Sequence, residues 1–285
     1  MTAPPPGRVF LVGAGPGDAE LLTVKAHRLL GAADCVLHDD LVSAEIVGLA
    51  GPRAIVVNVG KRCGRKGITQ LEINRVMILF ARAGLNVVRL KSGDPLIFGR
   101  LNEEVDALDA AGAAYEVVPG ITAGFAAAAT LGVSLTDRRT SARVLILSGH
   151  RAPAGAAEED AWLEAGRADT TLMIYMPGRD LGPVREKLRG VGRAADTPCV
   201  VISSVSTAAQ RAMRTTLGHL PSLVAIEAPA ILLVGRSLQR ANRGLGNELA
   251  EATCNTNIQL TSRSGGGTEV QDYGELLQNQ LDRRV

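Results

Sequence analysis

Two short segments rich in glycine and aspartate are the parts of this chain best suited to hold a ligand. Residues 12–18 (VGAGPGD) follow one apolar run, and residues 92–95 (SGDP) follow another. Glycine lets the backbone approach a ligand closely, and the carboxylate of Asp94 accepts hydrogen bonds. A ligand that carries hydrogen-bond donors or a positive charge would suit both segments.

The first segment does not match a dinucleotide-binding loop. Asp18 stands where the G-x-G-x-x-G fingerprint has its third glycine, and Pro16 lacks the N–H that a pyrophosphate would need. We therefore expect a ligand other than a phosphate. The plainer alternative is a tight strand-to-helix turn in which Asp18 lies at the N-terminus of the helix.

Side chains that could transfer protons follow further apolar runs. Asp39 comes after residues 35–37, and Lys61 comes after residues 55–59. Partial burial can tune the pKa of such groups, although most charged side chains are simply exposed to solvent. His150 also follows an apolar run, but a lone histidine is more often structural than catalytic.

Several cations could together attract a polyanion: Arg89, Lys91, Arg100, Arg138 and Arg139. Of these, Arg100 and Arg138 lie beside the segments expected to bind a ligand. The formal net charge of the whole chain is only +2, which argues against a nucleic acid or a membrane surface as partner.

Motifs of several other enzyme classes are missing from the sequence. The four cysteines form no C-x-x-C pair, and there is no H-E-x-x-H, G-x-S-x-G or Walker A motif. We therefore expect no metal, no serine hydrolase and no P-loop NTPase. No signal-peptide pattern and no apolar run of roughly 18 residues is present, so we expect a soluble, cytoplasmic protein.

The elements that must position these residues alternate between strands and helices. The predicted strands of the first half are residues 8–12, 35–37, 55–59, 87–90 and 116–118. Such alternation favours an α/β fold with a mostly parallel sheet. Ligands of these sheets bind beyond the carboxyl ends of the strands, where both glycine-rich segments, Asp39 and Lys61 fall.

Strand patterns resume in the second half of the chain, at residues 144–147, 172–176, 199–202 and 230–234, with an antiparallel strand expected at 215–217. Apolar content falls near residues 134–141, so we expect one α/β domain over residues 1–136 and another over 137–241. Residues 242–285 are polar and predict a flexible tail.

Read in order, the motifs resemble those of the S-adenosylmethionine-dependent tetrapyrrole methylases, and among them the enzymes that methylate uroporphyrinogen III. The motifs include VGAGPGD at 12–18, VGKR at 59–62, GDPxxFGR at 93–100, VVPGITA at 117–123 and YM at 175–176. The resemblance extends from about residue 8 to about residue 240 and leaves out the tail.

The resemblance implies two α/β domains with an active-site cleft between them, S-adenosylmethionine bound in that cleft, and a homodimer. It also implies methylation of two ring carbons of uroporphyrinogen III. The products would be precorrin-2, formed through precorrin-1, and S-adenosylhomocysteine. This chemistry belongs to sirohaem, cobalamin and haem d1 biosynthesis.

Matched residue by residue, the family assigns Asp39 as proton acceptor and Lys61 as proton donor. Arg100 and Arg138 suit the carboxylates of the substrate. The implied cofactor contacts are Pro16, Ser92, Gly93, Asp94, Ile97, Thr122, Ala123, Met176, Val205 and Ala230.

Some positions depart from the family pattern. Asp40 replaces a common arginine, Asp137 a histidine, and Ser92 and Val205 each replace a glycine. Leu101 and Asn102 replace a usual pair of glycines. Two alternatives stay open: a sister precorrin methylase that acts on a later intermediate, and a relative that binds S-adenosylmethionine or a tetrapyrrole without turnover.

Overall fold

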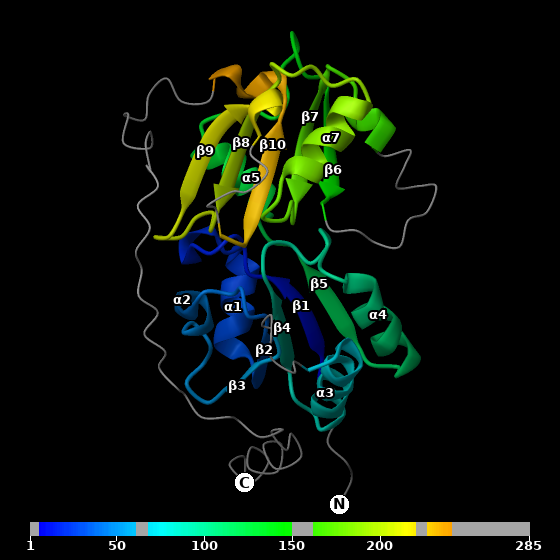
Figure 1. The fold of residues 1–285 in the computed structure, drawn as a ribbon. Helices are drawn as coiled ribbons and strands as arrows, with labels where there is room; N and C mark the ends of the chain where they lie inside the picture. Colours follow the sequence, from blue (N-terminus) through cyan, green and yellow to red (C-terminus); the bar gives the residue numbers. More distant parts are fainter. Residues whose placement is uncertain (1–5, 61–67, 150–161, 221–226, 241–285) are drawn as a thin grey trace, which may run out of the picture.

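The computed structural model describes residues 6–60, 68–149, 162–220 and 227–240. Strands and helices alternate through its first part, in the order that the sequence pattern predicts (Figure 1). The elements are β1 (Val9–Gly13), η1 (Ala19–Leu21), α1 (Val24–Ala32), β2 (Cys35–His38), α2 (Ala44–Val47), β3 (Ile55–Asn58), α3 (Gln70–Arg82), β4 (Val87–Lys91), α4 (Leu101–Ala110) and β5 (Tyr115–Val118).

The first sheet is parallel throughout and has the strand order β3-β2-β4-β1-β5. All five strands therefore end at the same edge. Since β1 lies between β4 and β5, the segments that follow these three strands must be neighbours. Strand β4 lies between β1 and β2, and Asp39 follows β2.

Helices cover both faces of the first sheet (Figure 1). Apolar side chains of α3 and α4, such as Phe80 and Leu108, pack on one face with Val87 of β4. Side chains of α1 and α2, such as Leu30 and Ile46, pack on the other face with Val88 and Leu90. Each side of β4 is therefore buried, and all five of its residues are inaccessible to solvent.

The second sheet is mixed and has the order β6-β7-β10-β8-β9. Only β6 and β7 run parallel, and the other pairs are antiparallel. The expected antiparallel strand near 215–217 is present as β9, which runs from Arg211 to Thr216. The elements are α5 (Ala123–Thr130), β6 (Arg143–Ser148), β7 (Thr170–Tyr175), α7 (Gly182–Gly190), β8 (Pro198–Ser203), β9, η2 (Leu217–His219), β10 (Ala230–Val234) and η3 (Arg236–Arg240).

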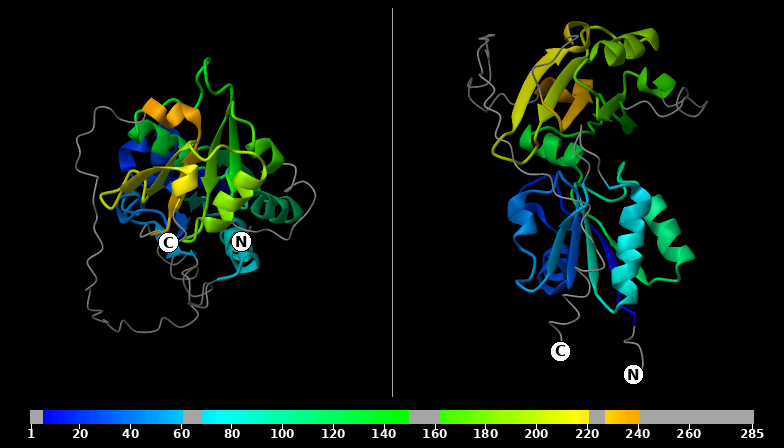
Figure 2. Two further views of the ribbon diagram at one scale, coloured as in Figure 1. Left: turned by 45° about the horizontal axis from the view of Figure 1, so that its top comes forward. Right: turned by 60° about the horizontal axis from the view of Figure 1, so that its bottom comes forward.

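Helix α5 packs with the second sheet although it directly follows the first. Its Ala126 and Ala127 lie in one apolar cluster with Met173 of β7 and Ile231 of β10. The division at residue 136 stays a prediction, but this packing joins α5 to the core of the second sheet. The two sheets lie one above the other in Figure 1 and in the right panel of Figure 2.

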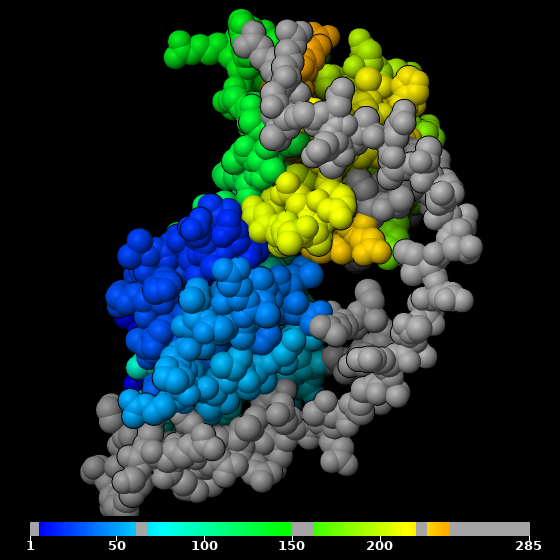
Figure 3. All heavy atoms as spheres, turned by 90° about the vertical axis from the view of Figure 1, so that its left-hand side faces the viewer, coloured from blue at the N-terminus to red at the C-terminus, as the bar shows by residue number. Residues whose placement is uncertain are grey.

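The two halves of the molecule also touch through loops. A Cβ atom on Gly17 would lie 2.6 Å from Cγ2 of Thr207, which stands between β8 and β9. In the space-filling view this second-half segment, in yellow, lies against the blue N-terminal part (Figure 3). Within the described ranges, no helix has both the length and the apolarity needed to cross a membrane.

Candidate functional site

The loops that follow β1 and β4 are joined by backbone hydrogen bonds. The N–H of Gly15 donates to the carbonyl of Gly93 at 3.0 Å, and the N–H of Gly93 donates back to Gly15 at 2.8 Å. Both glycines have positive φ, 72° and 67°, a region that side chains rarely adopt. The two segments expected to bind a ligand therefore form one continuous backbone surface.

The loop after β5 joins this surface through Asp94. One carboxylate oxygen of Asp94 accepts the N–H of Gly120 at 3.1 Å, and the other accepts that of Leu96 at 2.7 Å. A Cβ on Gly120 would lie 2.4 Å from the carbonyl oxygen of Gly93, so only glycine allows this approach. Asp94 thus holds two loops together and spends both oxygens on backbone N–H groups.

The start of α5 and the end of β7 complete the arrangement. The position of a Cβ on Gly93 would lie 3.8 Å from the nitrogen of Ala123, and the hydroxyl of Thr122 lies 2.6 Å from that of Tyr175. Met176 follows with φ of 50° and an exposed side chain. Strain of this kind in a residue other than glycine is frequent at functional sites.

The other predicted cofactor residues lie around the same junction. Ile97 packs on the cluster that contains Tyr175, and Ala230 pairs with Ser203 at the end of β8. The side chain of Val205 is buried in that cluster, so only its backbone could face a ligand. Pro16 is partly exposed beside Gly15.

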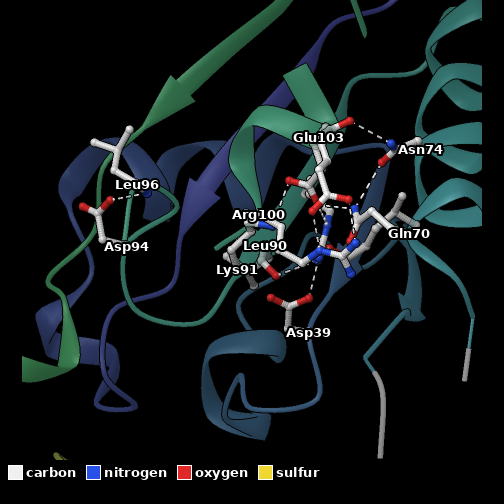
Figure 4. A network of polar contacts seen from close by, with 12 residues as sticks. Asp39, Gln70, Asn74, Leu90, Lys91, Asp94, Leu96, Arg100 and Glu103 are labelled. Atoms are coloured by element: carbon white, nitrogen blue, oxygen red, sulfur yellow. Dashed lines mark hydrogen bonds and ion pairs between the residues drawn. The ribbon is translucent and has the colours of Figure 1, made fainter. Parts of the chain in front are cut away.

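Asp39 is fixed by a buried network of charges (Figure 4). Its Oδ1 accepts a hydrogen bond from Nη2 of Arg89 at 2.5 Å. The Nε of Arg89 donates to Glu104 at 3.0 Å, and Nζ of Lys91 donates to the second oxygen of Glu104 at 2.8 Å. Gln70 of α3 also donates to Glu104, at 3.2 Å. The two carboxylates thus balance the two cations within one network.

Burial and charge act against each other in this network. Burial opposes the charge of Arg89, but the carboxylates of Asp39 and Glu104 outweigh it, so the pKa of Arg89 is raised. For Lys91, burial and the neighbouring Arg89 prevail over the carboxylates of Glu104 and Asp39, and the pKa is lowered. Arg89 is therefore the permanent cation beside Asp39.

The expectation that five cations form one polyanion-binding cluster is wrong. Arg89 and Lys91 are buried and paired with carboxylates. Arg139 is held by Asp137 through contacts of 2.8 and 3.0 Å, which shape the turn before β6. Arg100 and Arg138 are exposed and stay candidates.

Arg100 is the N-cap residue of α4 and has φ of 55°, and its guanidinium binds both oxygens of Glu103 at 2.6 and 2.7 Å. This pair raises the pKa of Arg100, mainly through the hydrogen bonds. Residues 95–96 and 98–103 line a shallow cavity of about 330 Å³. The exposed side chains of Leu96 and Phe98 are part of its lining, so this cavity combines apolar surface with one paired cation.

A groove of about 900 Å³ lies between the first loop, α5 and the segment between β8 and β9. Its lining includes Gly17, Asp18, Phe125 and Thr207, but none of the predicted cofactor residues. Asp18 caps η1, since its Oδ1 accepts the N–H of Glu20 at 2.8 Å. The capping alternative is thus confirmed for Asp18, whereas the backbone of the loop faces the site.

Some predicted residues lie outside the described part of the chain. They are Lys61, His150 and the tail from residue 242. Two residues of the site were missed by the sequence reasoning, Glu104 and Tyr175. Two cations in a buried strand demand a buried carboxylate, so Arg89 and Lys91 gave a signal for Glu104. Tyr175 is part of the motif YM at 175–176, but no local signal indicated its contact with the start of α5.

The site fits a cationic, donor-rich cofactor such as S-adenosylmethionine better than a metal. Glycines of three loops let their backbones approach one another closely, so this surface consists of peptide groups and the carboxylate of Asp94. Among the described residues, no group of histidine, cysteine and carboxylate side chains could hold a metal ion.

Comparison with known proteins points in one direction. The sequence pattern of the family described as tetrapyrrole (corrin/porphyrin) methylases matches residues 8–221. An S-adenosyl-L-methionine-dependent uroporphyrinogen III methyltransferase of Arabidopsis thaliana, described as chloroplastic, is 40% identical over 237 residues, which cover 82% of this chain and 64% of that protein. A methyltransferase of the same description from Methanosarcina barkeri is 40% identical over 232 residues, covering 80% of this chain and 91% of that one.

A solved structure agrees with the sequence matches. Uroporphyrin-III C-methyltransferase from Thermus thermophilus, in complex with S-adenosylhomocysteine, matches with a TM-score of 0.71 and 36% identity, covering 82% of this chain and 94% of that one. With several other curated relatives, this chain spans only 49% to 54% of the relative's length.

Proposed function

The chain belongs to the family of tetrapyrrole (corrin/porphyrin) methylases, and we propose that it methylates two ring carbons of uroporphyrinogen III with S-adenosylmethionine as methyl donor. The products are precorrin-2, formed through precorrin-1, and S-adenosylhomocysteine. Precorrin-2 serves sirohaem, cobalamin or haem d1 biosynthesis. The observation that carries the proposal is the joining of the loops after β1, β4 and β5 at one edge of the sheet, against Thr122 and Tyr175.

The proposed cofactor contacts are the ten residues named from the sequence, from Pro16 to Ala230. S-adenosylmethionine, when bound, supplies an electrophilic methyl group. The chain contributes backbone carbonyls of the Gly15–Gly93 surface. The carboxylate of Asp94 holds the loop after β5 against this surface through the N–H of Gly120. Holding donor and acceptor in one geometry provides much of the acceleration in such transfers.

Asp39 is the proposed proton acceptor and Lys61 the proposed proton donor. Within the described residues, Oδ2 of Asp39 has no hydrogen-bond partner, while Oδ1 is held by Arg89. Oδ2 is therefore the oxygen that can take a proton from the methylated ring. Arg100 and Arg138 are proposed to bind carboxylates of the substrate. For this, Arg100 must release the carboxylate of Glu103 and bind one of the substrate in its place.

The deciding experiment is anaerobic incubation of the protein with freshly made uroporphyrinogen III and S-adenosylmethionine, followed by mass spectrometry. We expect products with one and two added methyl groups. Bound S-adenosylmethionine without methylated product would refute the proposal and favour a binding relative. If the protein methylates a later ring intermediate but not uroporphyrinogen III, a sister precorrin methylase would be favoured.

The same assay tests Asp39. Asp39→Asn should lower the rate about 100-fold or more, as loss of a general base does. Asp106→Asn, on the exposed side of α4, is the control and should keep the wild-type rate. A wild-type rate for Asp39→Asn would remove Asp39 from the base role.

We also propose a cytoplasmic homodimer, for which light scattering should give twice the mass of the chain.

A further inference from the structure

The hydroxyl of Tyr175 lies at the junction of β7 and the N-terminus of α5. Tyr175 is the last residue of β7, and its side chain is nearly inaccessible to solvent. Its oxygen accepts the N–H of Gly124 at 3.0 Å and lies 2.6 Å from the hydroxyl of Thr122. Neither the sequence motifs nor the proposed reaction assigns it a role.

Tyr175 replaces the usual cap of α5. A helix N-cap side chain normally accepts the N–H of the second or third helical residue. Thr122 is the N-cap of α5 but makes no such bond, and the N–H of Gly124, the second residue, goes to Tyr175. The bond requires glycine at this position, since a Cβ on Gly124 would lie 2.8 Å from the Tyr175 oxygen and 2.0 Å from Sδ of Met173.

The ring of Tyr175 reaches the loop after β4. Its centroid lies 5.3 Å from that of Phe98, at an interplanar angle of 57°. Phe98 has φ of 52°, so this contact supports a strained position of the loop that carries Gly93, Asp94 and Ile97. Tyr175 therefore contacts both the loop and the start of α5, and its backbone leads into Met176.

Burial raises the pKa of Tyr175, although its bonds to Thr122 and Gly124 act in the opposite direction. The hydroxyl therefore keeps its proton near neutral pH. Because it already accepts from Gly124, it can donate that proton to Thr122 Oγ1, which fixes the rotamer of the threonine.

We propose that Tyr175 is a positioning residue of the cofactor site, whose hydroxyl sets the start of α5 and the Thr122 side chain while its ring holds the loop after β4. This inference rests on the proposed function, because the ligand that it concerns is S-adenosylmethionine or its product. Tyr175 touches no reacting atom in this scheme and acts through Thr122, Gly124 and Phe98.

The test is the affinity for S-adenosylhomocysteine, measured by calorimetry on the full chain without substrate. Tyr175→Phe keeps the ring and should bind about tenfold more weakly, the effect of one lost hydrogen bond. The control is Tyr115→Phe, because the hydroxyl of Tyr115 makes only a long, exposed contact of 3.5 Å to Asp109. This control should bind as the wild type does.

A double-mutant cycle separates positioning from general destabilisation. Thr122→Val should weaken the binding of S-adenosylhomocysteine, and Thr122→Ser should preserve it. In the Tyr175→Phe background, Thr122→Val should weaken binding by a much smaller factor than it does in the wild type. If Tyr175 had a merely structural role, the fold-losses in affinity of Tyr175→Phe and Thr122→Val would multiply in the double variant. If Tyr175→Phe does not fold, unchanged binding by Thr122→Val would overturn the inference, and weakening by Thr122→Val but not Thr122→Ser would support it.

The outcomes distinguish this inference from the proposed function. Wild-type protein that does not bind S-adenosylhomocysteine would contradict the proposed function itself. Wild-type binding together with unchanged binding by Tyr175→Phe would overturn only the role of Tyr175.

Discussion

At the scale of single residues, the ion pair between Asp39 and Arg89 determines what the proposed base can do. One oxygen of Asp39 is held at 2.5 Å by a buried guanidinium, and 28% of its side chain is accessible to solvent. The carboxylate is therefore oriented without being enclosed. Its second oxygen is left to face the ring from which the proposed base takes a proton.

Cys199 gives a residue-scale prediction for pH dependence. Burial raises the pKa of this thiol to about 12, against the opposing effect of Arg193, from an ordinary value of 9.0. Because the folded-state pKa is the higher one, the stabilisation is complete below pH 9 and is lost as the pH rises from 9 towards 12. Between pH 8 and about pH 10.5, the wild type should lose about 2 kcal/mol more stability than Cys199→Ala.

Urea unfolding at the two pH values, with reductant present, measures this difference. Val200→Ala is the matched control, because Val200 is a buried neighbour on β8 without a titrating group. It should follow the wild-type pH profile. Equal losses in wild type and Cys199→Ala would contradict the prediction.

At the scale of elements, strand β4 is unusual because it is central and carries two cations. Val87, Arg89 and Lys91 share the face that packs under α3 and α4, while Val88 and Leu90 face the other side. Glu104 in the first turns of α4 meets both cations, and Gln70 of α3 adds a hydrogen bond. The pairing of α4 with β4 thus depends on charge as well as on apolar contact.

Glu104→Gln should therefore destabilise the protein strongly. It keeps the shape of the side chain but leaves Arg89 and Lys91 with one carboxylate, a change that typically costs about 3–5 kcal/mol. The comparison is Glu103→Gln, whose pair with Arg100 is half-exposed and contributes less than about 1 kcal/mol. Denaturant unfolding gives both values, and similar losses for the two variants would show that the network is not stabilising.

At the scale of the whole molecule, the contact between Gly17 and Thr207 joins the first loop to the second sheet. Gly17 has φ of 144°, and a Cβ would lie 2.6 Å from Cγ2 of Thr207. Gly17→Ala should therefore cost about 1–3 kcal/mol through overpacking and backbone strain. Part of the loss should return in the double variant with Thr207→Ser, which removes the opposing methyl group.

Gly31→Ala is the control for this prediction. Gly31 lies in α1 with nothing within 4 Å of a Cβ, so alanine should stabilise the helix by about 0.5–1 kcal/mol. Urea unfolding measures all three variants. A Gly17→Ala variant as stable as the wild type would show that the two halves adjust to one another freely.

The sequence alone determined the order of strands and helices in the described residues and the loops that follow the strands. It could do so because alternating apolar residues, glycine and proline act through local geometry. The loops at residues 12–18 and 92–95 were expected at the carboxyl ends of parallel strands, and the parallel pairing of β1 with β4 bears this out. The family motifs added the chemistry.

Only the tertiary structure decided which residues become partners. It buried Arg89 and Lys91, which the sequence presented as available cations, and it joined α5 to the second sheet. It also brought Tyr175 to Thr122, which stands 53 positions away in the chain. Such contacts depend on strand order and on the faces that helices cover, and no local pattern of residues encodes either.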